Sequence, residues 1–350
     1  MGRIKFLDGY RGLAIFLVVL FHAYTRWTSI VPYGDQYSKF IFFKEGFLGV
    51  ELFFLISGFV ILMSLSKSRN FISFINRRWL RLFPAMLVST ILIYSTARFL
   101  PERPAGIPRV EEVIPGLLFI EPSWINGIFG THVRVLAGSF WSLFVEMKFY
   151  VIFGVLFFLL GDLKAILGIL FLYIVWIASH LLPNFVPVRN VTNFLSFKYF
   201  GWFAGGAFCY LYYLEKKKKY ILLYFVVSFL NVLSYKGNLS NLIGSSIICI
   251  VFIFPICFDR VAVFFDNKVI LFLGFISYPL YLIHEDAMIA LIVKLNTHFP
   301  FIPGWCLPII PFLALCGIAY IVARVFEPNV RRVLKEAGGL PGLLKRTAVQ

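Results

Sequence analysis

The stretch LDGYRGLAIFLVVLFHAY, residues 7–24, predicts a membrane-spanning helix that carries two ionisable side chains, Arg11 and His22. Ionisable groups at membrane depth are costly in free energy, so they usually face a protein interior and indicate a functional site. Eleven helical steps of about 100° bring the two side chains to within about 20° of each other. The stretch therefore predicts one helix face with both groups, about 16 Å apart along the axis, or about half the hydrocarbon thickness.

Both residues also have structural interpretations. Arg11 could extend its guanidinium to the lipid headgroups, and His22 could be a hydrogen-bonded packing residue. Further polar blocks are needed to decide between these interpretations and a functional one.

The composition indicates a membrane protein along the whole chain. Of the 350 residues, 60% are hydrophobic and 14% are charged, whereas soluble domains have about 25% charged residues. Apolar segments of membrane-spanning length recur from end to end, and helices satisfy the backbone hydrogen bonds there. We therefore predict an all-α, polytopic transmembrane protein with about ten spans. These spans lie near residues 10–27, 47–65, 84–100, 140–160, 165–182, 199–214, 220–235, 241–257, 269–293 and 305–325.

The segment 114–129 is apolar but is interrupted by Pro and Gly, so we expect it to be partly inserted or to lie on the membrane surface. The sequence has no recognisable soluble domain or internal repeat. We predict one transmembrane domain over residues 1–330 and a short basic cytoplasmic tail over residues 331–350.

The distribution of Lys and Arg predicts the orientation. With the N-terminus inside, the cytoplasmic loops hold more basic residues than the outside loops, including the run from Lys216 to Lys219 and the tail from Arg331 to Arg346. An even number of spans then places both termini inside. Positive-inside loops and contact with anionic lipids account for much of the net charge of +16, so no nucleic-acid partner is expected.

The cysteines predict neither a metal site nor a disulfide framework, because they lie in apolar segments without ligand spacing. We interpret them as small core residues and expect no bound metal. They are Cys209, Cys249, Cys257, Cys306 and Cys316.

Residues 77–84 read RRWLRLFP and place three arginines before the predicted third span. Arg78 and Arg81 are neighbours on one face if the segment is helical, and Arg77 adjoins them. A guanidinium is suited to bidentate recognition of phosphate. The alternative is that the block only anchors the next span on the cytoplasmic side.

Three further blocks set polar side chains among apolar ones: GVELFFLISGF at 49–59, SFWSLFVEMKFY at 139–150 and SYPLYLIHED at 277–286. An acid or imidazole in such a setting needs a partner, a cavity or an aqueous face. Ser57 and Gly58 could instead allow close packing of helices. The candidate pocket residues in these blocks are Glu51, Ser57, Trp141, Ser142, Glu146, Tyr150, Ser277, Tyr281 and His284.

The blocks LDGYRGLAIFLVVLFHA, GVELFFLISGF, RRWLRLFP, FWSLFVEMKFY and ISYPLYLIH stand in the order found in the acyltransferase 3 family of membrane O-acyltransferases, which the chain resembles from residue 7 to residue 328. The resemblance implies that His22 is catalytic with Arg11 as its motif partner. It also implies that Arg78 and Arg81 handle an acyl-CoA donor. Two departures are Lys148, where the family often has a polar amide, and Glu285, where an aromatic residue is common.

The resemblance implies transfer of an acyl group, expected to be acetyl, from cytoplasmic acyl-CoA to a hydroxyl of a cell-envelope carbohydrate, either a glycan or a lipid-linked sugar. It also implies a multi-pass protein of the bacterial cytoplasmic membrane. His22 would act as a base near neutral pH, through direct transfer or an acyl-histidine intermediate. Acyl-CoA is then a substrate, and no bound cofactor is expected.

The competing interpretation is a transporter or flippase, because buried Arg, His and Glu also form proton relays and substrate paths. Such proteins often have paired halves with matching helix breaks, and no such pairing is recognisable in this sequence. A purely structural membrane protein would not need so many polar groups at membrane depth.

Overall fold

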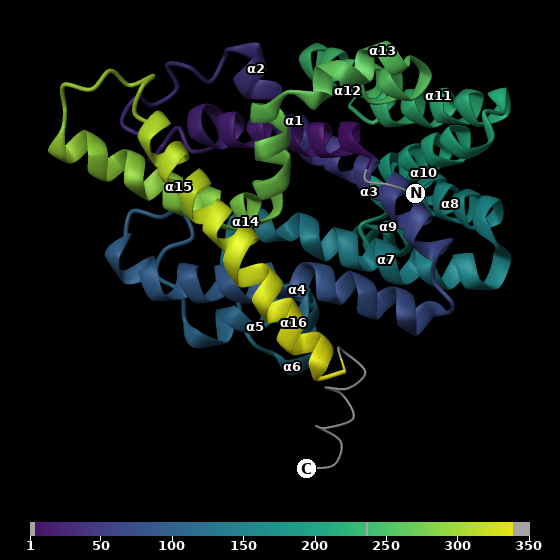
Figure 1. The fold of residues 1–350 in the computed structure, drawn as a ribbon, viewed down its shortest axis with the longest axis horizontal. Coiled ribbons are helices and arrows are strands. Elements are labelled where there is room, and N and C mark those ends of the chain that lie inside the picture. Colours follow the sequence, from purple (N-terminus) through teal and green to yellow (C-terminus); the bar gives the residue numbers. More distant parts are fainter. Residues whose placement is uncertain (1–3, 236, 339–350) are drawn as a thin grey trace. The chain divides into compact units, whose positions relative to one another are not determined.

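The computed structural model describes residues 4–235 and 237–338, and these residues form helices and connecting loops without a β-strand (Figure 1). The α-helices are α1 (Lys5–Phe21), α2 (Ile41–Lys44), α3 (Gly49–Leu65), α4 (Phe71–Thr96), α5 (Ile114–Leu118), α6 (Pro122–Phe129), α7 (Trp141–Leu160), α8 (Asp162–Leu181), α9 (Val186–Phe194), α10 (Phe200–Glu215), α11 (Lys218–Leu233), α12 (Leu239–Cys257), α13 (Asp259–Ala262), α14 (Lys268–His298), α15 (Ile309–Ile321) and α16 (Glu327–Glu336). Two π-helical turns, η1 (His22–Arg26) and η8 (Val322–Phe326), continue α1 and α15.

Eight helical segments among the described residues are long and apolar enough to cross a membrane. They are Lys5–Arg26, Ile41–Leu65, Phe71–Phe99, Gly138–Leu160, Asp162–Leu181, Leu239–Cys257, Lys268–His298 and Ile309–Glu336. The spans predicted at 199–214 and 220–235 form α10 and α11, which have 16 residues each, fewer than the roughly 20 residues of a full crossing. The all-α, polytopic architecture is confirmed, while the number of ten spans stays a prediction.

One predicted boundary is wrong. The third span is predicted near 84–100, but α4 begins at Phe71 and includes Pro84 in its interior. The arginine block 77–84 therefore lies within the helix and not before it. The segment 114–129 is divided into α5 and α6 with Phe119 between them in a left-handed conformation (φ 56°), which agrees with the expectation that it is not one continuous span.

The chain divides into two compact units. Unit 1 comprises the described residues of Met1–Ala14, Phe47–Ile75 and Val145–Leu271. Its core is built around α3 and α10, whose backbones approach closely because each has a glycine at the contact: a Cβ on Gly58 would overlap the backbone of Phe203. Small residues permit such close packing of membrane helices. The packing interpretation of Gly58 is therefore supported.

Unit 2 comprises the described residues of Ile15–Gly46, Asn76–Phe144 and Phe272–Gln350. The part of α14 from Leu273 to Ile292 is largely buried, while α15, η8 and α16 follow one another without a break, as the yellow rod in Figure 1 shows. The domain limits at residues 330 and 331 stay a prediction. Of the tail predicted at 331–350, residues 339–350 lie outside the described residues.

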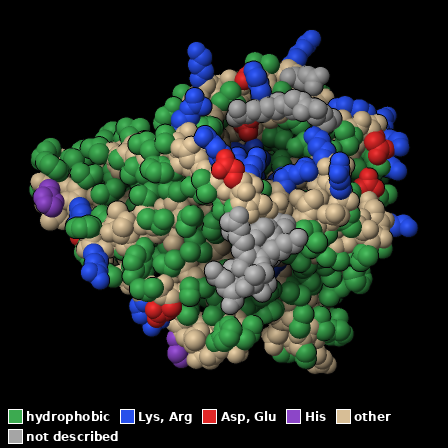
Figure 2. Space-filling model, turned by 60° about the horizontal axis from the view of Figure 1, so that its bottom comes forward, with side chains coloured by type: hydrophobic (Ala, Val, Ile, Leu, Met, Phe, Trp, Pro, Cys, Tyr) green, Lys and Arg blue, Asp and Glu red, His purple; other side chains and the backbone are tan. Residues whose placement is uncertain are grey.

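Large apolar side chains cover much of the outer surface, as Figure 2 shows for one face. Phe171, Leu222 and Phe229 are each more than 60% exposed. Such a surface in water would be an aggregation hazard, whereas lipid chains solvate it. The surface, together with the long apolar helices, identifies an integral membrane protein.

Candidate active site

His22 lies where the regular α1 helix ends and the π-helical turn η1 begins. Single π-helical turns inside helices are frequent at functional sites, because they change the direction of side chains. The predicted helix that contains Arg11 and His22 is therefore present, with its α-helical part ending one residue before the histidine. Arg11 belongs to unit 1 and pairs with Asp8, its Nη1 lying 2.8 Å from Oδ1.

The hydrogen-bond partners of His22 indicate which ring nitrogen carries the hydrogen. Its Nδ1 lies 2.9 Å from the carbonyl oxygen of Val18, which can only accept, so Nδ1 carries a hydrogen. The same Nδ1 lies 3.2 Å from Nε2 of His284. Nδ1 of His284 faces the carbonyl oxygen of Tyr281 at 3.0 Å, so the neutral His284 ring accepts at Nε2. In neutral His22 the basic nitrogen is therefore Nε2.

Glu285 faces that basic nitrogen. Its Oε1 lies 3.4 Å from Nε2 of His22 and accepts a hydrogen bond of 3.2 Å from Nε1 of Trp27. The His22 and Glu285 side chains are 12% and 5% exposed. A Cβ on Gly138 would lie only 2.8 Å from a carboxylate oxygen of Glu285, so the missing side chain makes room for the acid. The sequence singled out Glu285 only as a departure from the family pattern.

The other predicted residues of block 277–286 are arranged differently. The Tyr281 hydroxyl lies 2.8 Å from Oγ of Ser142, and its ring centroid lies 5.7 Å from that of the fully buried His284. The Ser277 hydroxyl instead donates to the carbonyl oxygen of Gly274, so it is engaged within its own helix. Trp141 begins α7 and is 38% exposed. The structure thus places Tyr281 and Ser142 near His284.

A second polar cluster lies in unit 1. The carboxylate of Glu146 accepts hydrogen bonds from the hydroxyls of Ser57 and Tyr150, so three predicted residues from two blocks meet. Glu51 is separate from this carboxylate and accepts a hydrogen bond of 2.6 Å from the Tyr235 hydroxyl.

Lys148, the other departure from the family pattern, has a structural function. Its Nζ donates to the carbonyl oxygen of Phe194 at 2.6 Å and to Oγ of Ser196 at 2.9 Å. Ser196 adopts a left-handed conformation with φ 61°, which is costly for a residue with a side chain. The ammonium group thus stabilises a strained turn.

The predicted phosphate-binding arginines lie on α4, within unit 2. Arg78 is buried, whereas Arg77 and Arg81 are exposed. Arg331 of α16 donates to the carbonyl oxygen of Leu80 at 3.1 Å and pairs with Glu327, which also interacts electrostatically with Arg81. The start of α16 therefore packs against the arginine block.

The segment 101–139 is fixed to α14 next to the histidine site. Arg103 donates to the carbonyl oxygen of Leu136 at 2.6 Å and lies 3.3 Å from the Asp286 carboxylate, which also accepts from the backbone N–H of Ala105. A small pocket beside this ion pair includes Ile283 in its lining. Near the end of this segment, Gly138 lies against the Glu285 carboxylate.

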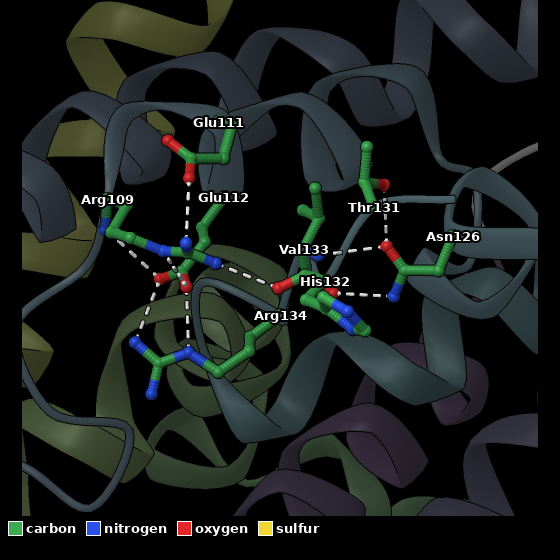
Figure 3. Close-up of polar contacts among 8 residues, drawn as sticks. All are labelled: Arg109, Glu111, Glu112, Asn126, Thr131, His132, Val133 and Arg134. Atoms are coloured by element: carbon green, nitrogen blue, oxygen red, sulfur yellow. Dashed lines mark hydrogen bonds and ion pairs between the residues drawn. The ribbon is translucent and has the colours of Figure 1, made fainter. Parts of the chain in front are cut away.

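Figure 3 shows how the middle of this segment is held together. The buried carboxylate of Glu112 lies between Arg109 and Arg134, with Nε of Arg134 at 2.7 Å. Burial by itself raises the pKa of Glu112, but hydrogen bonds from Arg134 and from the backbone of Arg109 outweigh it, and the pKa is lowered. The amide of Asn126 bonds to both backbone groups of Val133.

These features define a class: a multi-pass helical membrane protein with a buried histidine–carboxylate pair and, within residues 4–235 and 237–338, no group of side chains arranged to hold a metal ion. The acyltransferase 3 family, described as an acyltransferase domain, matches residues 4–326. The chain belongs to this family, and the resemblance seen in its motifs is confirmed.

Two relatives illustrate the similarity. A protein named as the membrane-bound transacylase BcsY, from Komagataeibacter xylinus, is 32% identical over 156 residues, which are 43% of this chain and 36% of the relative. The O-acetyltransferase OatA of Staphylococcus aureus is 28% identical over 207 residues, which are 56% of this chain and 31% of OatA. The matches thus span about a third of the length of these relatives. No solved structure matches the chain.

Proposed function

We propose that this acyltransferase is a membrane O-acetyltransferase that transfers an acetyl group from acetyl-CoA to a hydroxyl of a cell-envelope carbohydrate. The observation that carries the proposal is the basic nitrogen Nε2 of His22, which is held in a buried polar site by the Val18 carbonyl and His284. Family membership supports acyl transfer, and the names of the relatives support O-acetyl as the group.

His22 performs the proton transfers in this proposal. Its Nε2 takes the proton of the acceptor hydroxyl while the oxygen forms a bond to the thioester carbonyl carbon. The carbon–sulfur bond then breaks, and the imidazolium returns the proton to the leaving thiolate. An acyl-histidine route has the same overall balance. A positioned base of this kind contributes about 10²–10⁴-fold to the rate.

Arg78 and Arg81, with Arg77 beside them, bind the phosphates of the donor in this proposal. Their location on α4, where Arg331 of α16 also contacts the helix, supports it, since several cationic groups together suit phosphate recognition. Arg11 is assigned to positioning within the motif of His22. Acyl-CoA is the substrate that supplies the group, and no bound cofactor is part of the mechanism.

The remaining predicted residues form pockets in this proposal. Tyr281, Ser142, Ser277, Trp141 and His284 belong to the histidine side. Glu146, Ser57 and Tyr150 form the second polar cluster, with Glu51 as a separate acid. These groups would orient a glycan or a lipid-linked sugar. The proposed location is the bacterial cytoplasmic membrane, with both termini inside.

The experiment that tests the proposal uses purified protein in nanodiscs with radiolabelled acetyl-CoA and envelope glycan. His22→Ala is expected to lower the rate of label transfer by about 10²–10⁴-fold without loss of folded protein. His132→Ala removes an exposed histidine and serves as the control. A folded His22→Ala variant with normal transfer would disprove the assignment of His22, and wild-type protein without transfer would disprove the proposed function.

A further inference from the structure

We propose that Glu285 is a positioning residue for His22: it stabilises, and thereby orients, the imidazolium that forms during transfer. This inference rests on the proposed function and extends it.

The charged groups around α14 show that Glu285, and not Asp286, faces His22. Two buried acids adjoin on this helix, and each has its own partner. Asp286 faces Arg103 and the backbone N–H of Ala105. Glu285 instead faces Nε2 of His22 and Nε1 of Trp27. A buried carboxylate needs hydrogen bonds or a charged partner. Trp27 supplies the hydrogen bond of the resting carboxylate, and His22 is the neighbouring group that becomes a cation during transfer.

The orientation of the carboxylate is fixed from two sides. Trp27 donates to Oε1, the oxygen that faces His22, and Gly138 leaves the space beside the carboxylate. Among the described residues, Oε2 has no hydrogen-bond partner although it is buried. Most buried side-chain polar atoms in proteins have a hydrogen-bond partner. This oxygen is therefore available to a donor on the substrate, such as a second hydroxyl of the acceptor sugar.

The path of the transferred proton defines the proposed function of Glu285. Before transfer, His22 is neutral with a lone pair on Nε2, and Glu285 is ionised. When Nε2 takes the hydroxyl proton, the pair becomes imidazolium and carboxylate, an arrangement that the 3.4 Å separation allows. The proton then passes to the thiolate and the pair returns to its first state. Glu285 neither gains nor loses a proton, and it favours the intermediate by electrostatic attraction.

The first test is Glu285→Gln, which removes the charge and keeps the size and the acceptor for Trp27. Hydrogen bonds to charged groups contribute about 1.5–3 kcal/mol. We therefore expect kcat to fall about 10- to 100-fold, while KM for acetyl-CoA changes less than about twofold. Glu285→Asp restores the charge and should recover part of kcat. A merely structural acid would instead affect the amount of folded protein and both kinetic constants together.

The second test moves the carboxylate without changing it. Gly138→Ala places a methyl group 2.8 Å from a Glu285 oxygen, so the acid has to shift and kcat should fall about 10-fold. The matched control is Gly127→Ala, because a Cβ on Gly127 meets nothing within 4 Å. This control should retain wild-type kcat.

The outcomes separate the inference from the proposed function. Loss of activity in His22→Ala together with full kcat in Glu285→Gln would overturn the inference alone. A normal rate in His22→Ala would overturn the assignment on which it rests. Reduced kcat in both Glu285→Gln and Gly138→Ala, with partial recovery in Glu285→Asp and an unchanged Gly127→Ala, is the expected result.

Discussion

Single side chains differ in how much of their function the sequence reveals. His22 and His284 could be recognised as candidate site residues, because an imidazole in an apolar helix is costly and usually indicates a functional site. The contact between them could not be predicted, because it joins residues 262 positions apart in the chain. For the same reason Glu285 was noted only as an unusual neighbour of His284. Ser277 shows the opposite case: its place in a polar block made it a candidate, but its hydroxyl bonds to its own helix.

The arginines give a prediction at this scale. Substitution of Arg78 or Arg81 by Gln should weaken acetyl-CoA binding by about 10- to 100-fold each, because charge-assisted hydrogen bonds to phosphate are lost. Acceptor binding should stay nearly constant. Titration of CoA and dephospho-CoA against wild type and variants measures the effect. Equal CoA affinity in wild type and the double variant would identify the arginines as membrane anchors only.

At the scale of elements, the apolar segments of membrane-spanning length predict where helices lie better than where they begin and end. The third span is predicted to begin near residue 84. In the structure α4 begins thirteen positions earlier and continues through Pro84. The ion pairs that brace the segment 101–139 could not be predicted, because Glu112 and Arg134 lie 22 positions apart in an irregular loop.

The braced segment yields a second prediction. Glu112→Gln should lower the free energy of unfolding of this segment by about 1–3 kcal/mol, because the buried carboxylate bonds to two arginines. Limited proteolysis within 101–139 should therefore become faster. Glu111→Gln, which changes a partly exposed acid paired with Arg109, is the control and should have little effect.

The stabilisation of this segment by the Glu112 ion pairs should depend on pH. The folded-state pKa of Glu112 is lowered, so its stabilising contribution is complete above the unfolded value of about 4.3 and is lost as the pH falls through the folded value. Proteolysis by an acid-tolerant protease should accelerate below about pH 4 in wild type. This acceleration should be much smaller in Glu112→Gln, and an equal acceleration in both would contradict the assignment.

At the scale of the whole molecule, the orientation in the membrane connects the proposed donor and acceptor sites. Lys and Arg patterns predict that the loop after α3 lies inside and the segment 101–139 lies outside. In a cysteine-free background, Ser68→Cys and Ile107→Cys report these two loops, and Ile107 is 53% exposed. In sealed vesicles of known orientation, a membrane-impermeant thiol reagent should label Ile107→Cys from outside and Ser68→Cys only after permeabilisation. Acetyl-CoA supplied on the inner side should then acylate glycan on the outer side. Labelling of both positions from one side would contradict the orientation, and a requirement for both substrates on the inner side would contradict transfer across the membrane.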